Sequence, residues 1–311
     1  MKVVFFGTSD RSVPILESLK SHFDTVLCVT KKDTVVGRKQ VAKETGVKKW
    51  AKEKNTNYIE INSLKGNDLQ HVLDEIKKAN PNYGVVADFS FIIPKEIIDL
   101  FDIRLINIHF SLLPKYRGSS PVQFAILNGE ETTGITFHVV DEKMDNGCIL
   151  FQSGYKLNGT ETSGELYDTL FNIAADKLPE VLEKYSQGQI TPLPQDIELA
   201  TFTYSKSHPK STFIFKEDAL VDWGKKPEEI NRLIRAFDPW PIAWSYLKDL
   251  EKSKCLEQKV KLKKHIDKDL KVKIYKAVIK DGKLSIEDIH VEGKSKTKWK
   301  DFENGYLDSA N

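Results

Sequence analysis

The sequence predicts an α/β protein: a Rossmann-like, mostly parallel sheet domain followed by a smaller β-rich module. In the front half, short apolar runs rich in β-branched and aromatic residues alternate with segments of helical periodicity, which is typical of βαβ units. In the back half, strand-like runs separated by turns follow a single short helix, which indicates a small barrel or a similar module. A stretch with two prolines and little periodicity separates the two halves.

The front elements follow one another in a regular order. The predicted strands and helices are "KVVFFG", "VPILESLKS", "TVLCVT", "LQHVLDEIKKA", "YGVVADF" and "RLINIHF". Gly7 and the polar residues after it predict a turn from strand to helix with an N-cap. No G-x-G-x-x-G motif follows the first strand, so the sequence does not support a nicotinamide-type dinucleotide site.

The remaining elements lead to the domain boundaries. We expect a helix in "PVQFAILNG", strands in "GITFHVV" and "CILFQSGYKL" around the loop "DEKMDNG", and a long helix at 165–185. Later we expect a helix in "PEEINRLIRAF" and strands in "AWSYL", "VKIYKAVI" and "LSIEDIHV". This organisation predicts a first domain at 1–188, a linker at 189–208 and a second domain at 209–311.

Composition narrows the class of protein. Of the 311 residues, 40% are hydrophobic and 30% charged, which is typical of a soluble globular chain with ample core material. No apolar run has the length of a membrane span or a signal peptide, so we expect no membrane partner. Cys28, Cys148 and Cys255 are widely spaced and match neither a disulfide framework nor metal ligands, so we expect a cytoplasmic protein.

The segment "NIHFSLLPKYRG" carries the first candidate site. On a strand, Asn107 and His109 point to the same side, and they lie where the apolar run ends, at the edge where open α/β sheets bind ligands. An amide that donates to a developing oxyanion and an imidazole that relays a proton suit acyl-group transfer. Asp145 is the candidate carboxylate, because its loop follows a strand predicted to lie beside Asn107.

From the residues alone, structural interpretations of this trio stay open. In these interpretations, Asn107 only caps the end of a strand and His109 is a hydrogen-bonded core histidine. Asp145 is then an ordinary turn aspartate before Asn-Gly. We interpret Ser111 as structural, because its hydroxyl can help the chain turn before "LLP".

A longer pattern then points to a family. Asn-x-His, Ser-Leu-Leu-Pro, Arg-Gly and, after a helix, an Asp-x-Gly loop occur in order in "NIHFSLLPKYRGSSPVQFAILNGEETTGITFHVVDEKMDNGCIL". This pattern resembles the core of the folate-dependent formyltransferases. "VTKKDTVVGRKQ" and "IRAFDPWPIAW" resemble segments of the branch that acts on methionyl-tRNA, the latter at the start of its OB-like carboxy-terminal domain. The resemblance covers almost the entire chain.

The resemblance implies a reaction and its residues. It implies transfer of the formyl group of 10-formyltetrahydrofolate to the α-amine of methionine on initiator methionyl-tRNA, with Asn107, His109 and Asp145 as the catalytic residues. Asn107 and His109 would stabilise the oxyanion, while Asp145 would hold His109 and assist proton removal. The formyl group is already activated by its folate nitrogen, so the resemblance implies neither a metal nor a covalent enzyme intermediate.

The resemblance also implies a folate pocket. "VVADFSFIIP" resembles the family's pocket segment, with Val86, Ala87, Asp88, Phe89 and Ser90 against the pterin. Leu112, Leu113 and Pro114 would shape the wall, whereas we expect Arg117 to anchor its own loop. The family commonly has Ala-Tyr-Gly where this chain has "ADFS", so we expect the pterin contacts to differ in detail. The same segment must also be a buried strand and its exit.

Positive charge gathers in the back half. Residues 252–283 contain 12 lysines and 4 acidic residues, and "KSKTKWK" adds more around Trp299. Such a surface gains affinity for phosphates by releasing counterions, and an aromatic residue on a basic strand can stack on a base. By themselves these lysines fit a solvated surface. Because they are attached to a core that resembles a formyltransferase, we expect them to contact tRNA. The candidate tRNA-binding residues are Arg38, Lys39, Lys261, Lys263, Lys264 and Lys298.

Two other functions remain alternatives. A sugar-nucleotide N-formyltransferase uses the same core, although "IRAFDPWP" and the basic tail argue against it, and a formyl-folate hydrolase reuses that core as well. The alternative without catalysis is an RNA-binding protein on an inactive formyltransferase scaffold, and the intact Asn107, His109 and Asp145 argue against that. We expect a monomer.

Overall fold

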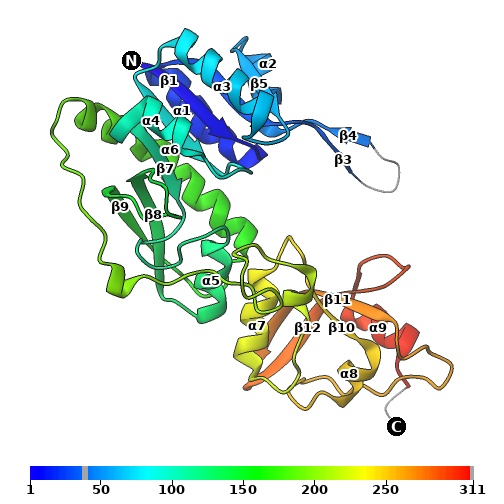
Figure 1. The fold of residues 1–311 in the computed structure, drawn as a ribbon. Coiled ribbons are helices and arrows are strands. Elements are labelled where there is room, and N and C mark those ends of the chain that lie inside the picture. The colour runs from blue at the N-terminus through cyan, green and yellow to red at the C-terminus, as the bar shows by residue number, and fades with distance from the viewer. Residues whose placement is uncertain (37–40, 309–311) are drawn as a thin grey trace. The chain divides into compact units, whose positions relative to one another are not determined.

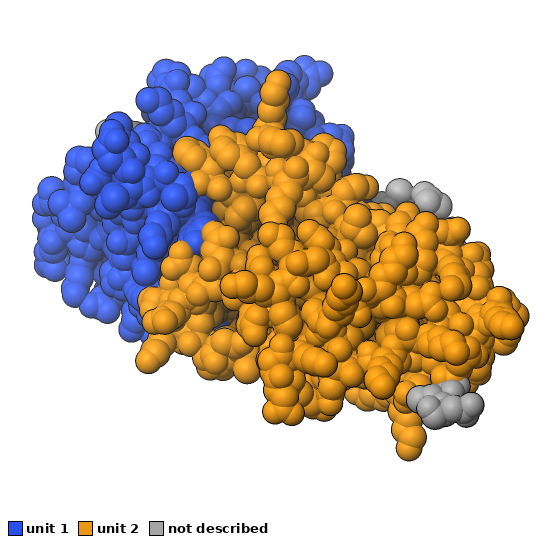
Figure 2. Space-filling model, turned by 90° about the horizontal axis from the view of Figure 1, so that it is seen from below, with its two compact units in different colours: residues 1–117, 133–155, 167–201 blue, residues 118–132, 156–166, 202–311 orange. Residues whose placement is uncertain are grey.

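The structure is a computed structural model that describes residues 1–36 and 41–308. Contacts divide the chain into two compact units (Figure 2). Unit 1 comprises residues 1–117, 133–155 and 167–201, and unit 2 comprises residues 118–132, 156–166 and 202–311. Each unit therefore gathers segments that are far apart in the sequence.

Within the described residues, the strands form three sheets (Figure 1). The seven-stranded sheet has the order β5-β2-β1-β6-β7-β8-β9, the four-stranded sheet has the order β10-β11-β12-β13, and β3 pairs with β4. In chain order the strands are β1 (Lys2–Gly7), β2 (Asp24–Lys31), β3 (Thr34–Val36), β4 (Val41–Lys43), β5 (Tyr58–Ile61), β6 (Tyr83–Ala87), β7 (Leu105–His109), β8 (Thr132–Val139), β9 (Ile149–Lys156), β10 (Ala243–Tyr246), β11 (Lys271–Lys280), β12 (Lys283–Val291) and β13 (Thr297–Lys298).

Helices follow most strands of the first sheet, as in βαβ units. In chain order the helices are α1 (Val13–His22), α2 (Gly46–Glu53), α3 (Gly66–Ala79), α4 (Lys95–Phe101), α5 (Pro121–Asn128), α6 (Ser163–Ser186), α7 (Pro227–Ala236), α8 (Leu247–Lys252) and α9 (Trp299–Tyr306). The 3-10 segments are η1 (Asp10–Ser12), η2 (Asp102–Arg104), η3 (Ile197–Leu199) and η4 (Lys216–Ala219). Within the described residues, none of these helices is long and apolar enough to cross a bilayer.

The large sheet is mostly parallel, which confirms the predicted fold class. β1 pairs in parallel with β2 and β6, and β6 pairs in parallel with β7. The four residues Val3 to Phe6 of β1 are all fully buried, because helices cover both faces of such a sheet. One of these faces packs against α3 and α4 through Val4 and Phe6. This burial explains why the strand appears in the sequence as a continuous apolar run rather than an alternating one.

β7 is the strand on which the parallel arrangement ends. Its other neighbour, β8, runs antiparallel and places Asn107 opposite His138 and His109 opposite Thr136. The strand expected to lie beside Asn107 is therefore the one that carries the Asp145 loop. The turn after β1 also agrees with the prediction, since the Ser9 side chain accepts from the Arg11 N–H and caps η1.

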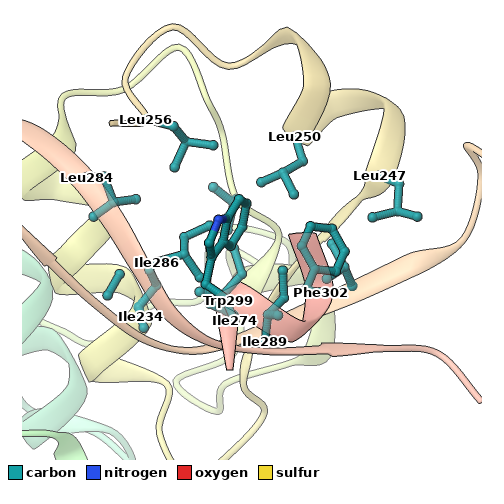
Figure 3. Close-up of a cluster of buried hydrophobic side chains, with 14 of the residues drawn as sticks. Ile234, Leu247, Leu250, Leu256, Ile274, Leu284, Ile286, Ile289, Trp299 and Phe302 are labelled. Atoms are coloured by element: carbon teal, nitrogen blue, oxygen red, sulfur yellow. The ribbon is translucent and has the colours of Figure 1, made fainter. Parts of the chain in front are cut away.

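Unit 2 contains the smaller β-rich, OB-like part. Its four strands are antiparallel, and its apolar core gathers side chains from α7, α8, α9 and the sheet (Figure 3). Trp299 and Phe302 of α9 lie in this core with 8% and 0% of their surface exposed. The expectation that Trp299 stands on a basic strand and stacks on a base is therefore wrong, because its indole is buried and its residue begins a helix.

Candidate functional site

Three predicted residues meet at the end of β7. The Asn107 Nδ2 lies 3.4 Å from Asp145 Oδ1, and the His109 Nδ1 lies 3.6 Å from Asp145 Oδ2. All three belong to unit 1. Asn107 and His109 share one side of β7 because side chains alternate along a strand, and the antiparallel β8 returns the chain to the same edge. The sheet topology thus brings together residues that are 38 positions apart.

A fourth residue, His138, belongs to this cluster and was missed by the sequence reasoning. Its Nδ1 lies 2.9 Å from the Val139 carbonyl oxygen, which can only accept, so Nδ1 carries the proton and Nε2 is an acceptor. Asn107 Nδ2 lies 3.0 Å from that Nε2 and donates to it. With the opposite amide orientation, the Asn107 oxygen would face both an unprotonated nitrogen and the Asp145 carboxylate. His138 therefore fixes which end of the amide faces Asp145.

The tautomer of His109 follows in the same way. Its Nε2 donates to the Tyr116 carbonyl oxygen at 2.9 Å. Burial lowers the pKa of His109 below its ordinary value, although the nearby Asp145 carboxylate acts in the opposite direction. With the proton on Nε2, the other ring nitrogen, Nδ1, faces the Asp145 carboxylate at 3.6 Å. This nitrogen can take up a proton while Asp145 stabilises the resulting charge.

The Asp145 loop, residues 141–148, depends on one glycine. A Cβ on Gly147 would lie 1.7 Å from the Val139 carbonyl oxygen, which no side chain can tolerate. Val139 N–H donates to the Cys148 carbonyl oxygen at 2.9 Å, so the loop closes tightly on the end of β8. Asp145 itself has φ of 48°, in the left-handed region that non-glycine residues seldom adopt. The loop can thus pack this closely against the end of β8 only because the Asp-x-Gly pattern places a glycine at position 147.

The side chains of Arg117 and Ser111 form hydrogen bonds with other residues of the protein. The Arg117 side chain is buried and donates to Gln195 Oε1 and to Asn146 Oδ1, which agrees with the expectation that it anchors its own loop. The Ser111 hydroxyl donates to the Lys115 carbonyl oxygen at 2.6 Å, inside the turn of "LLPK". Gln195 was another residue that the sequence did not reveal, because its partners are about 50 and 78 positions away.

The predicted folate segment is partly a buried strand. Val86 and Ala87 end β6 with 7% and 0% exposure, and Asp88 has φ of 49°. The Asp88 carboxylate accepts the Ser9 hydroxyl, while Ser90 N–H donates to Thr8 Oγ1 at 3.2 Å. The segment is thereby tied to the turn that follows β1.

Beyond this strand end the segment is apolar. The Phe89 ring packs edge-on against Phe6, with centroids 5.6 Å apart. Ile92 exposes 84% of its surface close to the same strand end. Of the predicted wall residues, Leu113 is buried, and its N–H donates to Thr136 Oγ1 at 3.1 Å, while Leu112 and Pro114 are half-buried.

Of the predicted tRNA residues of unit 2, three have side chains near the two ends of α9. Lys298 Nζ lies 2.6 Å from Asp288 Oδ1 at the start of the helix. Lys263 Nζ donates to the Asn304 carbonyl oxygen at the other end, and Lys261 Nζ lies 3.7 Å from Asp308 Oδ2. Lys264 is exposed. Arg38 and Lys39 lie outside the described residues.

Comparison of the sequence with known proteins identifies the family of the chain that carries this site. The "Formyl transferase" family model matches residues 1–182, which is more than half of the chain, and the "Formyl transferase, C-terminal domain" model matches residues 214–307. The chain belongs to the formyl transferase family. Within that family it is 31% identical over 309 residues to the methionyl-tRNA formyltransferase of Clostridium novyi, which spans 98% of this chain and 97% of that protein.

Solved formyl transferases share the fold. A methionyl-tRNA formyltransferase from Clostridium thermocellum is 21% identical, with a TM-score of 0.58 over 94% of this chain and 98% of that chain. WlaRD, a sugar 3N-formyl transferase, is 21% identical as well, with a TM-score of 0.59 over 95% and 99%. The fold alone therefore does not distinguish the acceptor of a methionyl-tRNA formyltransferase from that of a sugar formyl transferase.

Proposed function

We propose that this formyl transferase moves the formyl group of 10-formyltetrahydrofolate to the α-amino group of methionine on initiator methionyl-tRNA. The observation that carries the chemistry is the convergence of an amide, an imidazole and a carboxylate within 3.6 Å at the mouth of the sheet. The acceptor is supported by relatives of that name at 31 to 37% identity, several of which match through the second domain.

In the proposed reaction the amine nitrogen attacks the formyl carbon. A new carbon–nitrogen bond forms while the carbonyl oxygen takes up negative charge, and the bond from the formyl carbon to the folate nitrogen then breaks. The amine loses a proton and the folate nitrogen gains one, so atoms and electrons balance without an oxidant or a metal. The protein has to stabilise the oxyanion and move the proton.

The trio divides these two tasks. Asn107 Nδ2 has one hydrogen on His138 and a second directed at Asp145 over a long 3.4 Å, and this second hydrogen can turn to the oxyanion. A donor of this kind contributes about 100- to 1,000-fold to the rate. Asp145 accepts the amine proton, directly or through Nδ1 of His109, and the proton then passes to the departing folate nitrogen.

We infer the substrate surfaces from the same residues. The folate would lie against residues 86–90, at and directly after the end of β6, and against residues 112–114. The tRNA would contact Lys261, Lys263, Lys264 and Lys298, together with Arg38 and Lys39. We also propose residues 1–188 as the formyltransferase domain, 189–208 as a linker and 209–311 as the tRNA-binding domain, active as a cytoplasmic monomer.

An assay with two acceptors tests the proposal. The protein is incubated with 10-formyltetrahydrofolate and either methionyl-tRNA or an amino-sugar nucleotide, beside the variant His109→Ala. We expect formylation of methionyl-tRNA by the wild type and its loss in a variant that still folds, as judged by circular dichroism. Formylation of the sugar alone rejects the acceptor, and near-full activity of His109→Ala removes that residue from the chemistry.

A further inference from the structure

The predicted linker contributes a structure of its own to unit 1. We call residues 192–201 the strap, and they form hydrogen bonds with the Asp145 loop and with its flanking strand β9. Leu193 exchanges two backbone hydrogen bonds with Ile149, at 2.7 and 2.9 Å, directly after the loop. At the other end, Thr201 accepts from the Arg117 N–H at 2.8 Å and donates its own N–H to Pro114 at 3.2 Å. The strap is thus attached to both segments that carry the candidate site.

Apolar burial does not hold the strap in place. Leu193, Ile197 and Leu199 expose 63%, 67% and 62% of their surfaces. An open pocket of about 380 Å³ is lined by the Asp145 loop and by strap residues that include Pro192 and Pro194. Since the hydrophobic effect scales with buried apolar area, it contributes little here. Hydrogen bonds from the strap must therefore determine how the loop and the strap fit together.

Gln195 makes the central set of these hydrogen bonds. Its Nε2 donates to the Asp145 carbonyl oxygen at 2.9 Å and to the Gly147 carbonyl oxygen at 2.8 Å. Its Oε1 accepts from Arg117 Nε and Nη2 at 3.2 and 2.7 Å. One amide group thereby joins the carboxylate-bearing loop to the arginine that follows "LLPKY".

Arg117 makes the orientation of this amide unambiguous. A guanidinium only donates, so the oxygen of Gln195 must face it and the NH₂ must face the two carbonyls. Arg117 Nη1 also donates to Asn146 Oδ1 at 3.0 Å, and Asn146 Nδ2 donates to Asp141 Oδ2 at 2.9 Å. The network therefore reaches the Asp145 loop on both sides of Asp145 itself.

We propose that Gln195 is a positioning residue for the reaction: by holding the carbonyls of Asp145 and Gly147, it sets the distance from the Asp145 carboxylate to His109 and Asn107. This inference rests on the proposed function. Asp145 needs such support, because a left-handed backbone at a non-glycine residue is intrinsically unfavourable and persists only where its surroundings enforce it. A displacement of about 1 Å at a reacting group can cost about 100-fold in rate.

The substitution Gln195→Glu separates the two halves of the network. A carboxylate keeps the acceptor for Arg117, so the buried guanidinium stays paired, but it has no hydrogen to donate to Asp145 and Gly147. Gln187→Glu is the matched control, since it makes the same change of charge at an exposed position near the end of α6. Gln195→Ala removes both halves and serves as the second variant.

We expect Gln195→Glu to lower kcat for formylation of methionyl-tRNA about 10- to 100-fold. Its thermal midpoint should stay at the wild-type value, and Gln187→Glu should match the wild type in both measurements. In the background of Asp145→Asn, the second change should have no further effect, because the two residues act as a unit. A fully additive loss, or an unchanged kcat in both Gln195 variants, overturns the proposal.

A second readout keeps this inference separate from the function. Hydrogen exchange of the amides in residues 141–148 should accelerate in Gln195→Glu and not in Gln187→Glu, whatever the acceptor. If the wild type fails to formylate methionyl-tRNA while exchange accelerates, the proposed function fails and the positioning contact stands. If exchange in the loop is unchanged, Gln195 does not hold the loop and the inference is wrong.

Discussion

The site at the end of β7 and the basic surface of unit 2 use charge in opposite ways. In unit 1 an acid, an amide and two imidazoles are buried or half-buried, and fixed hydrogen bonds determine which atom faces which. In unit 2 many lysines are exposed, and several lie beside carboxylates, as Lys298 does beside Asp288 and Lys276 does beside Glu287. The count of lysines therefore overstates the positive charge available to a phosphate.

This difference has a physical origin. A buried polar group must be paired or it costs free energy, so the site around Asp145 has few alternative arrangements. An exposed lysine and its partner contribute little to stability and can separate when a polyanion arrives. Activity should consequently fall sharply on single substitutions around Asp145. The affinity of the basic surface of unit 2 should change little on single substitutions and should depend on the salt concentration.

The largest effect should follow from Asp145→Asn, which keeps the shape of the side chain and removes the base. We expect kcat to fall about 1,000-fold or more, equivalent to roughly 4 kcal/mol, with the fold unchanged. The control is Asp176→Asn on the exposed face of α6. Steady-state formylation kinetics decide the matter: retention of a tenth or more of the activity would mean that the carboxylate is only a loop residue.

An intermediate effect should follow from Trp299→Ala, which affects stability rather than chemistry. Removing this buried indole from the core of unit 2 should lower the free energy of unfolding by about 3 kcal/mol. Trp299→Phe should cost less, because the indole N–H has no hydrogen-bond partner among the described residues. Trp240, which is 52% exposed, supplies the control Trp240→Ala.

Denaturant unfolding measures these differences, and tRNA affinity measured beside it tests the alternative. If Trp299 stacked on a base, Trp299→Ala would weaken tRNA binding in a folded protein, whereas Trp299→Phe would keep a ring that can stack. A stable Trp299→Ala variant with weakened binding would restore the stacking hypothesis and contradict the burial argument.

The smallest effect should follow from Lys264→Ala on the exposed surface of unit 2. We expect KM for the tRNA to rise roughly threefold, with kcat unchanged, and the slope of log affinity against log salt to fall by about 0.9. Lys78→Ala on α3 is the control, because that lysine is exposed in unit 1. An unchanged salt slope would assign Lys264 to the solvated surface and weaken the distinction drawn above.

Local pattern predicted much of the fold and part of the site. Buried runs such as "KVVFFG" and the periodic helix α6 were predictable, because burial and amphipathic spacing are local properties. α2, α4, α8 and α9 were not predicted: α4 and α8 have only seven and six residues, and α9 begins within a lysine-rich stretch. For short segments of this kind, tertiary packing outweighs local propensity.

The sequence by itself determined which chemical groups are present at the end of β7, and the alternation of a strand determined that Asn107 and His109 share a side. Only the tertiary structure decided their partners. His138 faces Asn107 through the antiparallel register of β8, and Gln195 reaches Asp145 across 50 residues. Such contacts depend on where distant backbone segments pack, which no local spacing encodes. The chain order therefore specified the reactive groups, and long-range packing specified their hydrogen bonds.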